Sequence, residues 1–383
     1  MSEELKYEEG GSLKSSHFNV NSGRFIIAGG GTGGHIFPAV AIANALKRLQ
    51  PSAEILFVGA KGRMEMEKVP QAGYRIKGLD IAGFNRSSLI KNIGLPWKLI
   101  KSFLQVRRIV NHFKPDAVIG VGGYSSFPVL RYAQAKGIKT FIHESNSFAG
   151  KSNSLLGKKA TKVFVATDGM EKFFPAQKII ISGNPVRPGI VNVSSINKDE
   201  ALAKFDLEKG RKTVFITGGS LGARSINEGI ANGLNDFESA GLQLIWQTGK
   251  TDAAKWKEQA TGKPFVWVND FISDMEHAYA AADIVISRAG AMAISELCVV
   301  QKPVLFVPFP FAAEDHQTIN ALNLVKRDAA LMIRDNEASV KMVPQIIELA
   351  QDESKQVQLK QNIGKLKVVD ADVKIADEIL KTI

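Results

Sequence analysis

The stretch Asp283-Ile-Val-Ile-Ser-Arg-Ala-Gly-Ala-Met-Ala-Ile-Ser-Glu296 predicts a buried strand, a tight turn and a helix in direct succession. Such a strand–glycine–helix junction presents free backbone N–H groups and the positive end of a helix dipole, which suits an anion. Arg288 adds a forked cation at the same end. Glu296 lies about two turns into the helix, where its carboxylate can accept hydrogen bonds from a sugar diol. On these residues alone, an ordinary α/β turn with a solvated arginine and glutamate explains the stretch equally well.

The same strand–glycine–helix order opens both halves of the chain. Residues 24–28 form a short apolar run, which is followed by the glycine-rich loop 29–34 and by apolar residues at helical spacing. After a break at 183–188, which is rich in proline, residues 214–217 and the loop 218–223 repeat this order. The chain is therefore expected to form two tandem Rossmann-like, doubly wound α/β domains that face a central cleft.

The remaining elements continue the alternation of strands and helices that is typical of parallel sheets. Apolar runs predict further strands at 54–58, 117–121, 140–143, 163–166, 179–182, 242–247, 265–268 and 304–307. Helical spacing predicts helices that include residues 127–136, 225–237, 339–349 and 373–380.

Length and composition bound the class of protein. A chain of 383 residues is long enough for two domains, and its formal net charge of +11 favours an acidic partner. The single cysteine, Cys298, excludes an internal disulfide and a cysteine-based metal cluster. Residues 1–23 are polar and lack the apolar core of a signal peptide, so we expect a disordered leader. No run reaches the roughly 18 apolar residues that a membrane span needs.

The loop Gly29-x-Gly31-x-x-Gly34 matches the dinucleotide-binding fingerprint literally. NAD binding also needs an acid at the end of the second strand, and residues 57–60 contain none, so an NAD oxidoreductase is disfavoured. The interpretation that remains for this loop is a nest of backbone N–H groups that binds a phosphate or a pyrophosphate. His35 follows the loop directly, and a histidine at the mouth of a cleft suits a general base, although a capping or packing role explains its position as well.

Other polar side chains follow predicted strands, where ligands of parallel sheets bind. His143 and Glu144 form an acid/base pair by composition, and a merely structural role is at least as good an explanation for each. In the second half, Gly218-Gly-Ser220 forms a second anion nest. His316, Gln317 and Asn320 open a helix with polar groups that suit a ligand rich in hydroxyls.

Residues 81–114 contain seven lysines and arginines and no acid. One helical face is predicted to pack on the sheet, formed by Leu99, Phe103, Val106, Val110 and Phe113. This face does not explain the apolar loop 84–95, which is interleaved with Arg86 and Lys91. Apolar side chains ringed by cations suit an anionic membrane surface. Nucleic acid is the weaker alternative, because no nucleic-acid-binding motif is present.

An ordered set of motifs resembles one known family. The set consists of Gly30-Gly-Thr-Gly-Gly-His35, Gly122-Gly-Tyr124, His143-Glu-x-Asn146, Gly183-Asn-Pro-Val-Arg187, Gly218-Gly-Ser-x-Gly-Ala223, Phe271-Ile-x-Asp-Met275 and Arg288-x-Gly-Ala291 with Glu296. It is similar to that of the bacterial peptidoglycan enzymes that add N-acetylglucosamine (GlcNAc) to lipid I, which are glycosyltransferases with the GT-B fold. The resemblance covers the chain from Arg24 onward. The chain departs from the family at Ser145 and His316, where many members have glutamine.

The resemblance implies a UDP-GlcNAc donor held by a C-terminal domain at 187–365, and an acceptor and membrane domain at 24–186 plus 366–383. It implies that Ile272 contacts uracil through its backbone and that Glu296 holds the ribose hydroxyls. The further donor and cleft residues that it implies are Thr32, Gly33, Gly34, Asn146, Arg187, Ser220, Arg288, Ala291, Met292, Ala293, Ile294, Ser295 and Gln317.

The implied reaction is an inverting transfer of GlcNAc to the 4-hydroxyl of MurNAc in lipid I, which gives lipid II for peptidoglycan synthesis and thereby serves cell-wall biogenesis, cell shape and cell division. His35 is the expected base, with Glu144 behind it. No metal or other cofactor is expected, and no nucleic-acid partner. The expected location is peripheral, on the cytoplasmic face of the bacterial cell membrane. The alternatives are another GT-B UDP-sugar enzyme, such as a glycolipid synthase or an epimerase, and a non-catalytic nucleotide sensor at a membrane.

Overall fold

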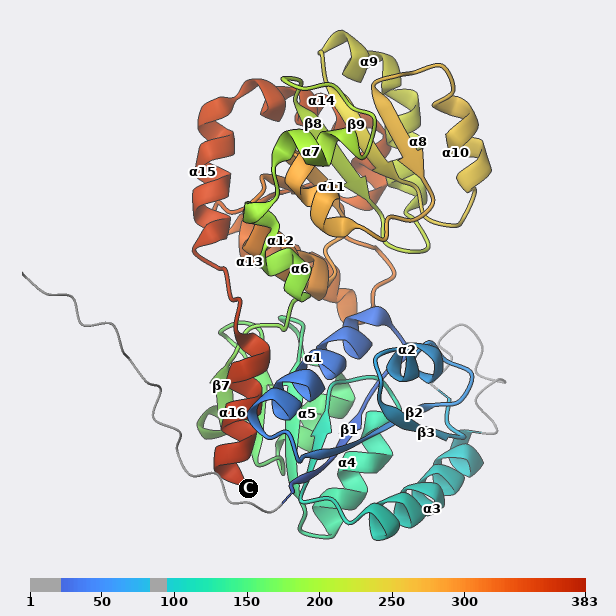
Figure 1. The fold of residues 1–383 in the computed structure, drawn as a ribbon, viewed down its shortest axis with the longest axis vertical. Helices are drawn as coiled ribbons and strands as arrows, with labels where there is room; N and C mark the ends of the chain where they lie inside the picture. The colour runs from blue at the N-terminus through green and yellow to red at the C-terminus, as the bar shows by residue number, and fades with distance from the viewer. Residues whose placement is uncertain (1–21, 83–94) are drawn as a thin grey trace, which may run out of the picture.

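The structure is a computed structural model that describes residues 22–82 and 95–383. The expected leader at 1–23 and the basic apolar loop at 84–95 lie outside the described residues, except at their last positions. Two parallel sheets, each covered by helices on both faces, are stacked along the long axis of the molecule (Figure 1). The expectation of two tandem doubly wound domains is confirmed.

The N-terminal sheet has the strand order β3-β2-β1-β4-β5-β6-β7, with every pair of neighbours parallel. Its strands are β1 (Arg24–Ala28), β2 (Glu54–Ala60), β3 (Arg75–Leu79), β4 (Ala117–Gly120), β5 (Lys139–Glu144), β6 (Lys162–Val165) and β7 (Ile179–Ile181). The helices around it are α1 (Gly33–Leu49), α2 (Glu65–Gln71), α3 (Leu95–Phe113), α4 (Ser126–Ala135) and α5 (Lys151–Gly157).

The C-terminal sheet repeats this order as β10-β9-β8-β11-β12-β13. Its strands are β8 (Thr213–Thr217), β9 (Gln243–Gln247), β10 (Val266–Asn269), β11 (Ile284–Ser287), β12 (Val304–Phe306) and β13 (Leu331–Met332). Its helices are α6 (Pro188–Val191), α7 (Lys198–Ala203), α8 (Arg224–Asn232), α9 (Leu234–Ser239), α10 (Ala253–Gln259), α11 (Met275–Ala281), α12 (Ala291–Val300), α13 (His316–Val325), α14 (Ala338–Gln351) and α15 (Glu353–Gly364).

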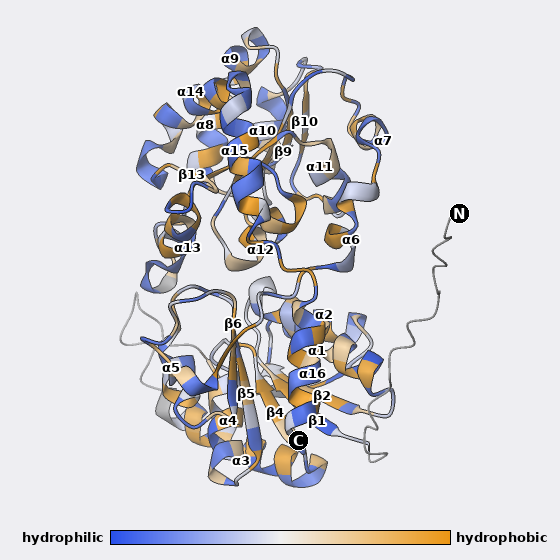
Figure 2. Cartoon of the chain, turned by 90° about the vertical axis from the view of Figure 1, so that its left-hand side faces the viewer, coloured by the Kyte–Doolittle hydropathy of each residue, from blue (hydrophilic) through white to orange (hydrophobic). Residues whose placement is uncertain are grey.

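Burial on both faces explains why these strands are continuous apolar runs rather than alternating ones. Phe25, Ile26 and Ile27 of β1 are all fully buried, and so are Ile284, Val285 and Ile286 of β11. Figure 2 shows the same contrast, with apolar strands enclosed by helices that carry hydrophilic stretches.

The last helix, α16 (Ala371–Thr382), returns to the N-terminal domain and lies beside α1 (Figure 1). Ile375, Ala376 and Ile379 are fully buried in the core between α1 and the sheet. The chain therefore crosses between the two domains twice, once near Gly183–Arg187 and once near Lys365–Asp370.

Several elements differ from the sequence prediction. Strands β3 and β13 and helix α15 were not predicted, because their alternating or short apolar patterns are weak. The helix predicted at 225–237 is broken into α8 and α9 at Gly233. Leu99, predicted to pack on the sheet, is instead 36% exposed, whereas Val106 and Val110 are buried as predicted.

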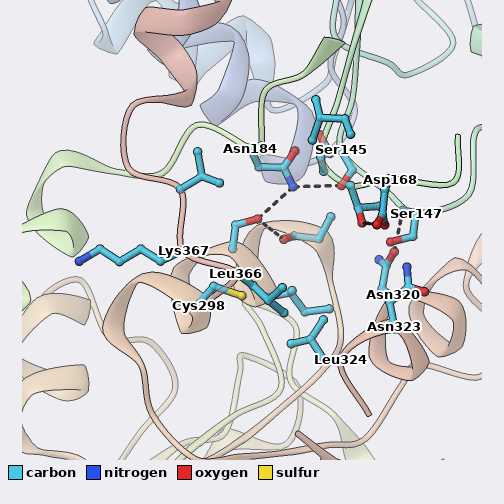
Figure 3. A pocket seen from close by; sticks show the side chains of 18 of the residues that line it. Ser145, Ser147, Asp168, Asn184, Cys298, Asn320, Asn323, Leu324, Leu366 and Lys367 are labelled. Carbon is cyan, nitrogen blue, oxygen red and sulfur yellow. Dashed lines mark hydrogen bonds between the residues drawn. The ribbon is translucent and has the colours of Figure 1, made fainter. Parts of the chain in front are cut away.

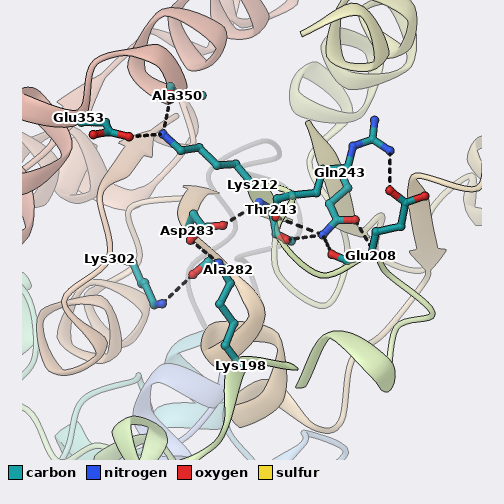
Figure 4. Close-up of polar contacts among 11 residues, drawn as sticks. Lys198, Glu208, Lys212, Thr213, Gln243, Ala282, Asp283, Lys302, Ala350 and Glu353 are labelled. Carbon is teal, nitrogen blue, oxygen red and sulfur yellow. Dashed lines mark hydrogen bonds and ion pairs between the residues drawn. The ribbon is translucent and has the colours of Figure 1, made fainter. Parts of the chain in front are cut away.

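The amino ends of the C-terminal strands are held by a polar network on the side away from the interdomain cleft (Figure 4). The Asp283 carboxylate accepts hydrogen bonds from the Thr213 backbone N–H (2.8 Å) and from the Lys198 ammonium (2.6 Å). Gln243 donates to the Thr213 hydroxyl. The Lys302 ammonium donates to Ala282 O, and burial lowers the pKa of Lys302 to about 8. These contacts fix β8 and β11 side by side, which places their carboxyl ends together.

Candidate functional site

Both sheets reverse their strand order at a central pair of strands, β1/β4 in one domain and β8/β11 in the other. Ligands of open α/β sheets bind outside the carboxyl ends of the strands at such switch points. The loops at these four strand ends are the glycine-rich segments 29–34, 122–124, 218–222 and 288–290. The topology therefore places the predicted anion nests at 29–34, 218–220 and 288–296 on the facing ends of the two domains (Figure 1).

The loop after β1 packs tightly against the loop after β4. The Gly29 N–H donates to Val58 O and the Gly30 N–H donates to Gly122 O. Gly123 has a φ of +83°, and a Cβ there would lie 2.4 Å from Gly30 O, so only glycine allows this approach. The structure places Thr32 as the residue before α1, with Gly33 and Gly34 in its first turn.

His35 points its ring back at this loop. Nδ1 lies 3.2 Å from Gly30 O and 3.3 Å from the Thr32 hydroxyl. Because a carbonyl oxygen only accepts, Nδ1 carries the proton, and Nε2 keeps a lone pair that has no hydrogen-bond donor among the described residues. Burial lowers the pKa of His35 below 6.5, while the charge of Glu144 raises the pKa and that of His316 lowers it. The pKa of His35 therefore depends on charges from both domains.

Glu144 and Asn146 form a hydrogen-bonded unit at the end of β5. The Glu144 carboxylate is buried and accepts from the Asn146 N–H (3.1 Å), the Asn146 amide (3.2 Å) and the Asn153 amide (2.9 Å). Through these hydrogen bonds, Glu144 holds the loop after β5 in its conformation. Its charge acts on His35 over a distance, without a direct hydrogen bond in the described part of the chain.

His143, in β5, has no surface exposed to the cleft. It is fully buried, and its Nε2 lies 3.4 Å from Gly183 O. Burial lowers its pKa to about 4, so His143 is neutral at physiological pH. Of the two readings that the sequence left open for His143, the structural one agrees with this geometry.

In the C-terminal domain, Ser220 is exposed in the turn after β8, where the Gly222 N–H donates to Gly219 O. The residue before α12 is Gly290, which offers no side-chain cap. The N–H groups of Ala291, Met292 and Ala293 have no acceptor among the described residues, so they remain available to an anion. Farther along α12, Ile294 is buried in the core, and the Ser295 hydroxyl donates to Ala291 O.

Arg288 does not extend toward these free N–H groups. Its Nη1 donates to Val307 O (2.9 Å), to Pro308 O (3.1 Å) and to the Asp335 carboxylate (2.5 Å). Arg288 is therefore occupied in bracing the end of β11 against β12 and Asp335. The sequence could not reveal this, since Asp335 is remote in the chain.

Glu296 is 7% exposed and is held by two partners from other elements. Arg187 of the interdomain crossing donates to Oε1 through both Nε (2.9 Å) and Nη2 (2.8 Å). Among the described residues, Oε2 has only a long contact, 3.4 Å, from the Tyr279 hydroxyl. Burial raises the pKa of Glu296, and Arg187 opposes this shift. Oε2 thus keeps acceptor capacity for ligand hydroxyl groups.

The remaining predicted donor residues lie at the edges of this site. The Ile272 N–H donates to Gln247 Oε1 (3.1 Å), which leaves its carbonyl as the backbone group open to a base. Gln317 Oε1 accepts from the Phe309 N–H (3.0 Å), which orients the amide at the start of α13.

The two domains also touch directly behind the facing loops (Figure 3). The Asn320 amide donates to Asn146 Oδ1 (3.2 Å) and accepts from the Ser147 N–H (2.9 Å). Asn184 donates to the Ser295 hydroxyl (3.0 Å) beside a cavity of about 290 Å³. Arg327, just after the end of α13, forms an ion pair with Asp168. Sequence reasoning had singled out Asn320 as a polar helix residue without giving it this bridging position.

Sequence reasoning missed Glu65 and Tyr279. Glu65 is 1% exposed beneath the loop at 29–34. Its neighbours Glu67 and Lys68 make it look like part of a solvated helix, so no local signal distinguishes it. Within residues 22–82 and 95–383, no cluster of histidine, cysteine or acidic side chains has the arrangement of a metal site.

The chain is similar to known proteins over nearly its whole length. Residues 25–165 match the glycosyltransferase family 28 N-terminal domain, and residues 213–375 match the glycosyltransferase family 28 C-terminal domain. It is 53% identical to the UDP-N-acetylglucosamine–N-acetylmuramyl-(pentapeptide) pyrophosphoryl-undecaprenol N-acetylglucosamine transferase of Phocaeicola vulgatus, over 94% of this chain and 96% of that protein. It is 52% identical to the enzyme of the same name from Parabacteroides distasonis, over 94% of this chain and 98% of that protein. The crystal structure of Acinetobacter baumannii MurG is also similar, with 27% identity and a TM-score of 0.77 over 94% of this chain and 100% of that one.

Proposed function

The chain belongs to glycosyltransferase family 28, and from this premise we infer that it transfers GlcNAc from UDP-GlcNAc to the 4-hydroxyl of MurNAc in lipid I, giving lipid II. The observation that carries this conclusion is the identity of about half of all residues, over 94% of the chain, with enzymes named for that transfer. The GT-B fold expected from the motifs is confirmed, and the transferase is favoured over the alternative of a glycolipid synthase or an epimerase.

We propose that the donor lies against the C-terminal domain (187–365). Three features support this: the free N–H groups at the start of α12 suit the diphosphate, Ser220 lies on the neighbouring loop, and Glu296 Oε2 suits the ribose hydroxyls. Uracil would contact the backbone of Ile272, and the amides of Gln317 and Asn146 would bind the sugar hydroxyls. Arg187 would act by holding Glu296, and Arg288 by bracing the turn.

The acceptor would lie against the N-terminal domain (24–186 with 366–383), with its pyrophosphate on the N–H groups at Thr32, Gly33 and Gly34. In the reaction, His35 Nε2 takes the proton of the MurNAc 4-hydroxyl as its oxygen forms the bond to C1 of GlcNAc. The bond from C1 to the diphosphate oxygen breaks at the same time, and UDP leaves with the charge. The helix dipole of α12 and its N–H groups stabilise that charge, and we propose that no metal ion is needed.

A transfer assay with radiolabelled UDP-GlcNAc and a lipid I analogue tests this function, with and without EDTA. We expect labelled lipid II and release of UDP in equal amounts, with a rate that EDTA leaves unchanged. Transfer to diacylglycerol, or epimerisation without acceptor, would contradict the function. Loss of activity in EDTA that added Mg²⁺ restores would contradict only the metal-free proposal.

We further propose that the protein binds anionic membrane on the cytoplasmic face through α3. Trp97, Ile100 and Leu104 are 75%, 51% and 56% exposed, and Lys98 and Lys101 lie among them. Exposed apolar side chains interleaved with cations suit an anionic lipid surface, and the lipid-linked acceptor requires access to one. Among the described residues, no helix is long and apolar enough to cross a membrane.

Replacing Trp97, Ile100 and Leu104 together by serine is expected to weaken binding to phosphatidylglycerol vesicles at least about tenfold, because each large apolar side chain contributes about 1.5–3 kcal/mol when it leaves water. Vesicle co-sedimentation measures this. Val340→Ser is the matched control, since Val340 is 74% exposed on α14 of the other domain. Equal vesicle binding by the triple variant and the wild type would show that α3 does not bind the membrane.

A further inference from the structure

Glu65, the first residue of α2, is a carboxylate buried beneath the glycine-rich loop. Its Oε2 accepts a hydrogen bond from the Gly31 N–H (2.8 Å), and its Oε1 accepts one from the Ala60 N–H (2.9 Å). The described residues supply no cation to this carboxylate. A buried charge without a counterion is costly unless hydrogen bonds replace its water, and here two backbone amides do so.

The loop and the end of β2 leave space for this carboxylate only because they are built from glycine. A Cβ on Gly30 would lie 2.3 Å from Glu65 Cδ, and a Cβ on Gly59 would lie 2.5 Å from Glu65 Cγ. Gly30 and Gly59 therefore serve the close approach of Glu65 to the backbone. This close approach lets the Glu65 carboxylate reach the peptide group between Gly30 and Gly31.

That peptide group joins Glu65 to His35. Its N–H, from Gly31, donates to Glu65 Oε2, and its carbonyl, from Gly30, accepts from His35 Nδ1. Because a peptide group is planar and trans, fixing the direction of the N–H fixes the direction of the carbonyl. A carboxylate that accepts from the N–H also polarises the carbonyl and strengthens the bond that it accepts.

The backbone N–H groups of the loop divide into two sets. Those of Gly29, Gly30 and Gly31 donate to Val58 O, Gly122 O and Glu65, and so anchor the loop to the domain. Those of Thr32, Gly33 and Gly34 have no acceptor among the described residues. Because the first N–H groups of a helix have no intrahelical partner and Thr32, Gly33 and Gly34 are not buried, the second set is accessible to a ligand. Glu65 accepts from the last N–H of the first set, directly before it.

We propose that Glu65 is a positioning residue for the transfer, which holds His35 through the Gly30–Gly31 peptide group in the orientation and tautomer that leave Nε2 free as the base. The inference rests on the proposed function of His35. A carboxylate bonded directly to an imidazole has this effect in Ser-His-Asp triads, and here a peptide group is interposed. The charge of Glu65 also raises the pKa of His35, which agrees with their proximity.

The test is Glu65→Gln, which keeps the size of the side chain but replaces one acceptor oxygen by an NH₂ group that faces a backbone N–H. We expect kcat with a lipid I analogue to fall about 10–100-fold, the usual effect of losing a residue that orients a functional histidine. The KM for UDP-GlcNAc is expected to stay within about twofold. The acid limb of kcat/KM is expected to move to lower pH, because the charge that raises the pKa of His35 is gone.

Glu67→Gln is the matched control, because Glu67 is a largely exposed carboxylate on the same helix, and it should leave all three quantities unchanged. A merely structural Glu65 would lower thermal stability and the active fraction without moving the pH profile, and that result would overturn the inference. An inactive wild type, or a fully active His35→Ala, would instead overturn the proposed function.

Two measurements on the unmodified protein keep the inference testable if Glu65→Gln does not fold. Nitrogen NMR with labelled histidine is expected to show His35 with its proton on Nδ1 at neutral pH. Hydrogen exchange is expected to show the Gly31 amide protected, and those of Gly33 and Gly34 exchanging faster. A proton on Nε2, or a Gly31 amide that exchanges as fast as its neighbours, would overturn the inference.

Discussion

Replacing His35 by alanine is expected to lower kcat for transfer to lipid I by about 10²–10⁴-fold, which is the usual contribution of a positioned general base. The physical reason is that the 4-hydroxyl of a sugar is a poor nucleophile until a base takes its proton as it attacks. His35 has the features of that base: Nδ1 is held at Gly30 O, Nε2 is free, and burial lowers its pKa so that the ring is neutral at pH 7.

The pH profile is a second readout of the same residue. Since burial lowers the pKa of His35 below 6.5, protonation of the ring should reduce kcat/KM only below pH 6.5, and this acid limb should disappear in His35→Ala. His112→Ala, at the exposed end of α3, is the control and should retain full activity. An unchanged kcat in His35→Ala would rule out His35 as the base and would make Glu144 the next candidate.

Replacing Glu296 by alanine is expected to raise the KM for UDP-GlcNAc about 10–100-fold, since hydrogen bonds to a charged group contribute about 1.5–3 kcal/mol. Oε1 is saturated by Arg187, so the affected bonds are those between Oε2 and the ribose. The change also leaves the Arg187 guanidinium without its partner at the crossing between domains. Initial rates over a range of UDP-GlcNAc concentrations, at saturating lipid I, measure the effect.

The control for Glu296 is Glu348→Ala, which removes an exposed carboxylate from α14 of the same domain and should not alter the donor KM. Glu296→Gln separates two contributions: it retains one acceptor oxygen but loses the charge that pairs with Arg187. We expect its donor KM to lie between those of the wild type and Glu296→Ala. A donor KM in Glu296→Ala equal to that of the wild type would show that the ribose lies elsewhere.

The sequence predicted the fold well where its signals are local. Residues 25–28 and 284–286 are apolar on both faces and are followed within four residues by a glycine turn, so they are found as the central strands β1 and β11. The strands at the sheet edges gave weaker signals. In β3, Arg75 and Lys77 alternate with apolar residues, and β13 has only two residues, so neither was found.

For the candidate site too, local signals were predicted from the sequence and long-range contacts were not. Glycine spacing and the polar residues after each strand identified the loops around His35, Ser220 and Glu296, because each of those signals lies within a few residues. The partners of these side chains could not be predicted, since they come from distant positions. Examples are Arg187 on Glu296, Asp335 on Arg288, and Asn320 on Asn146.

The sequence by itself determined that two glycine-opened α/β domains occur in tandem and which loops carry the anion nests, because apolar periodicity and backbone freedom are properties of neighbouring residues. Only the tertiary structure decided what each charged side chain does. In the structure, Arg288 is paired with Asp335, and Oε2 of Glu296 keeps capacity to accept hydrogen bonds. Glu65, which looks like a solvated residue in the sequence, is buried and holds the loop before His35 through a hydrogen bond. The physical reason is that burial and hydrogen-bond partners set the role of a charge, and both depend on contacts between segments that lie far apart in the chain.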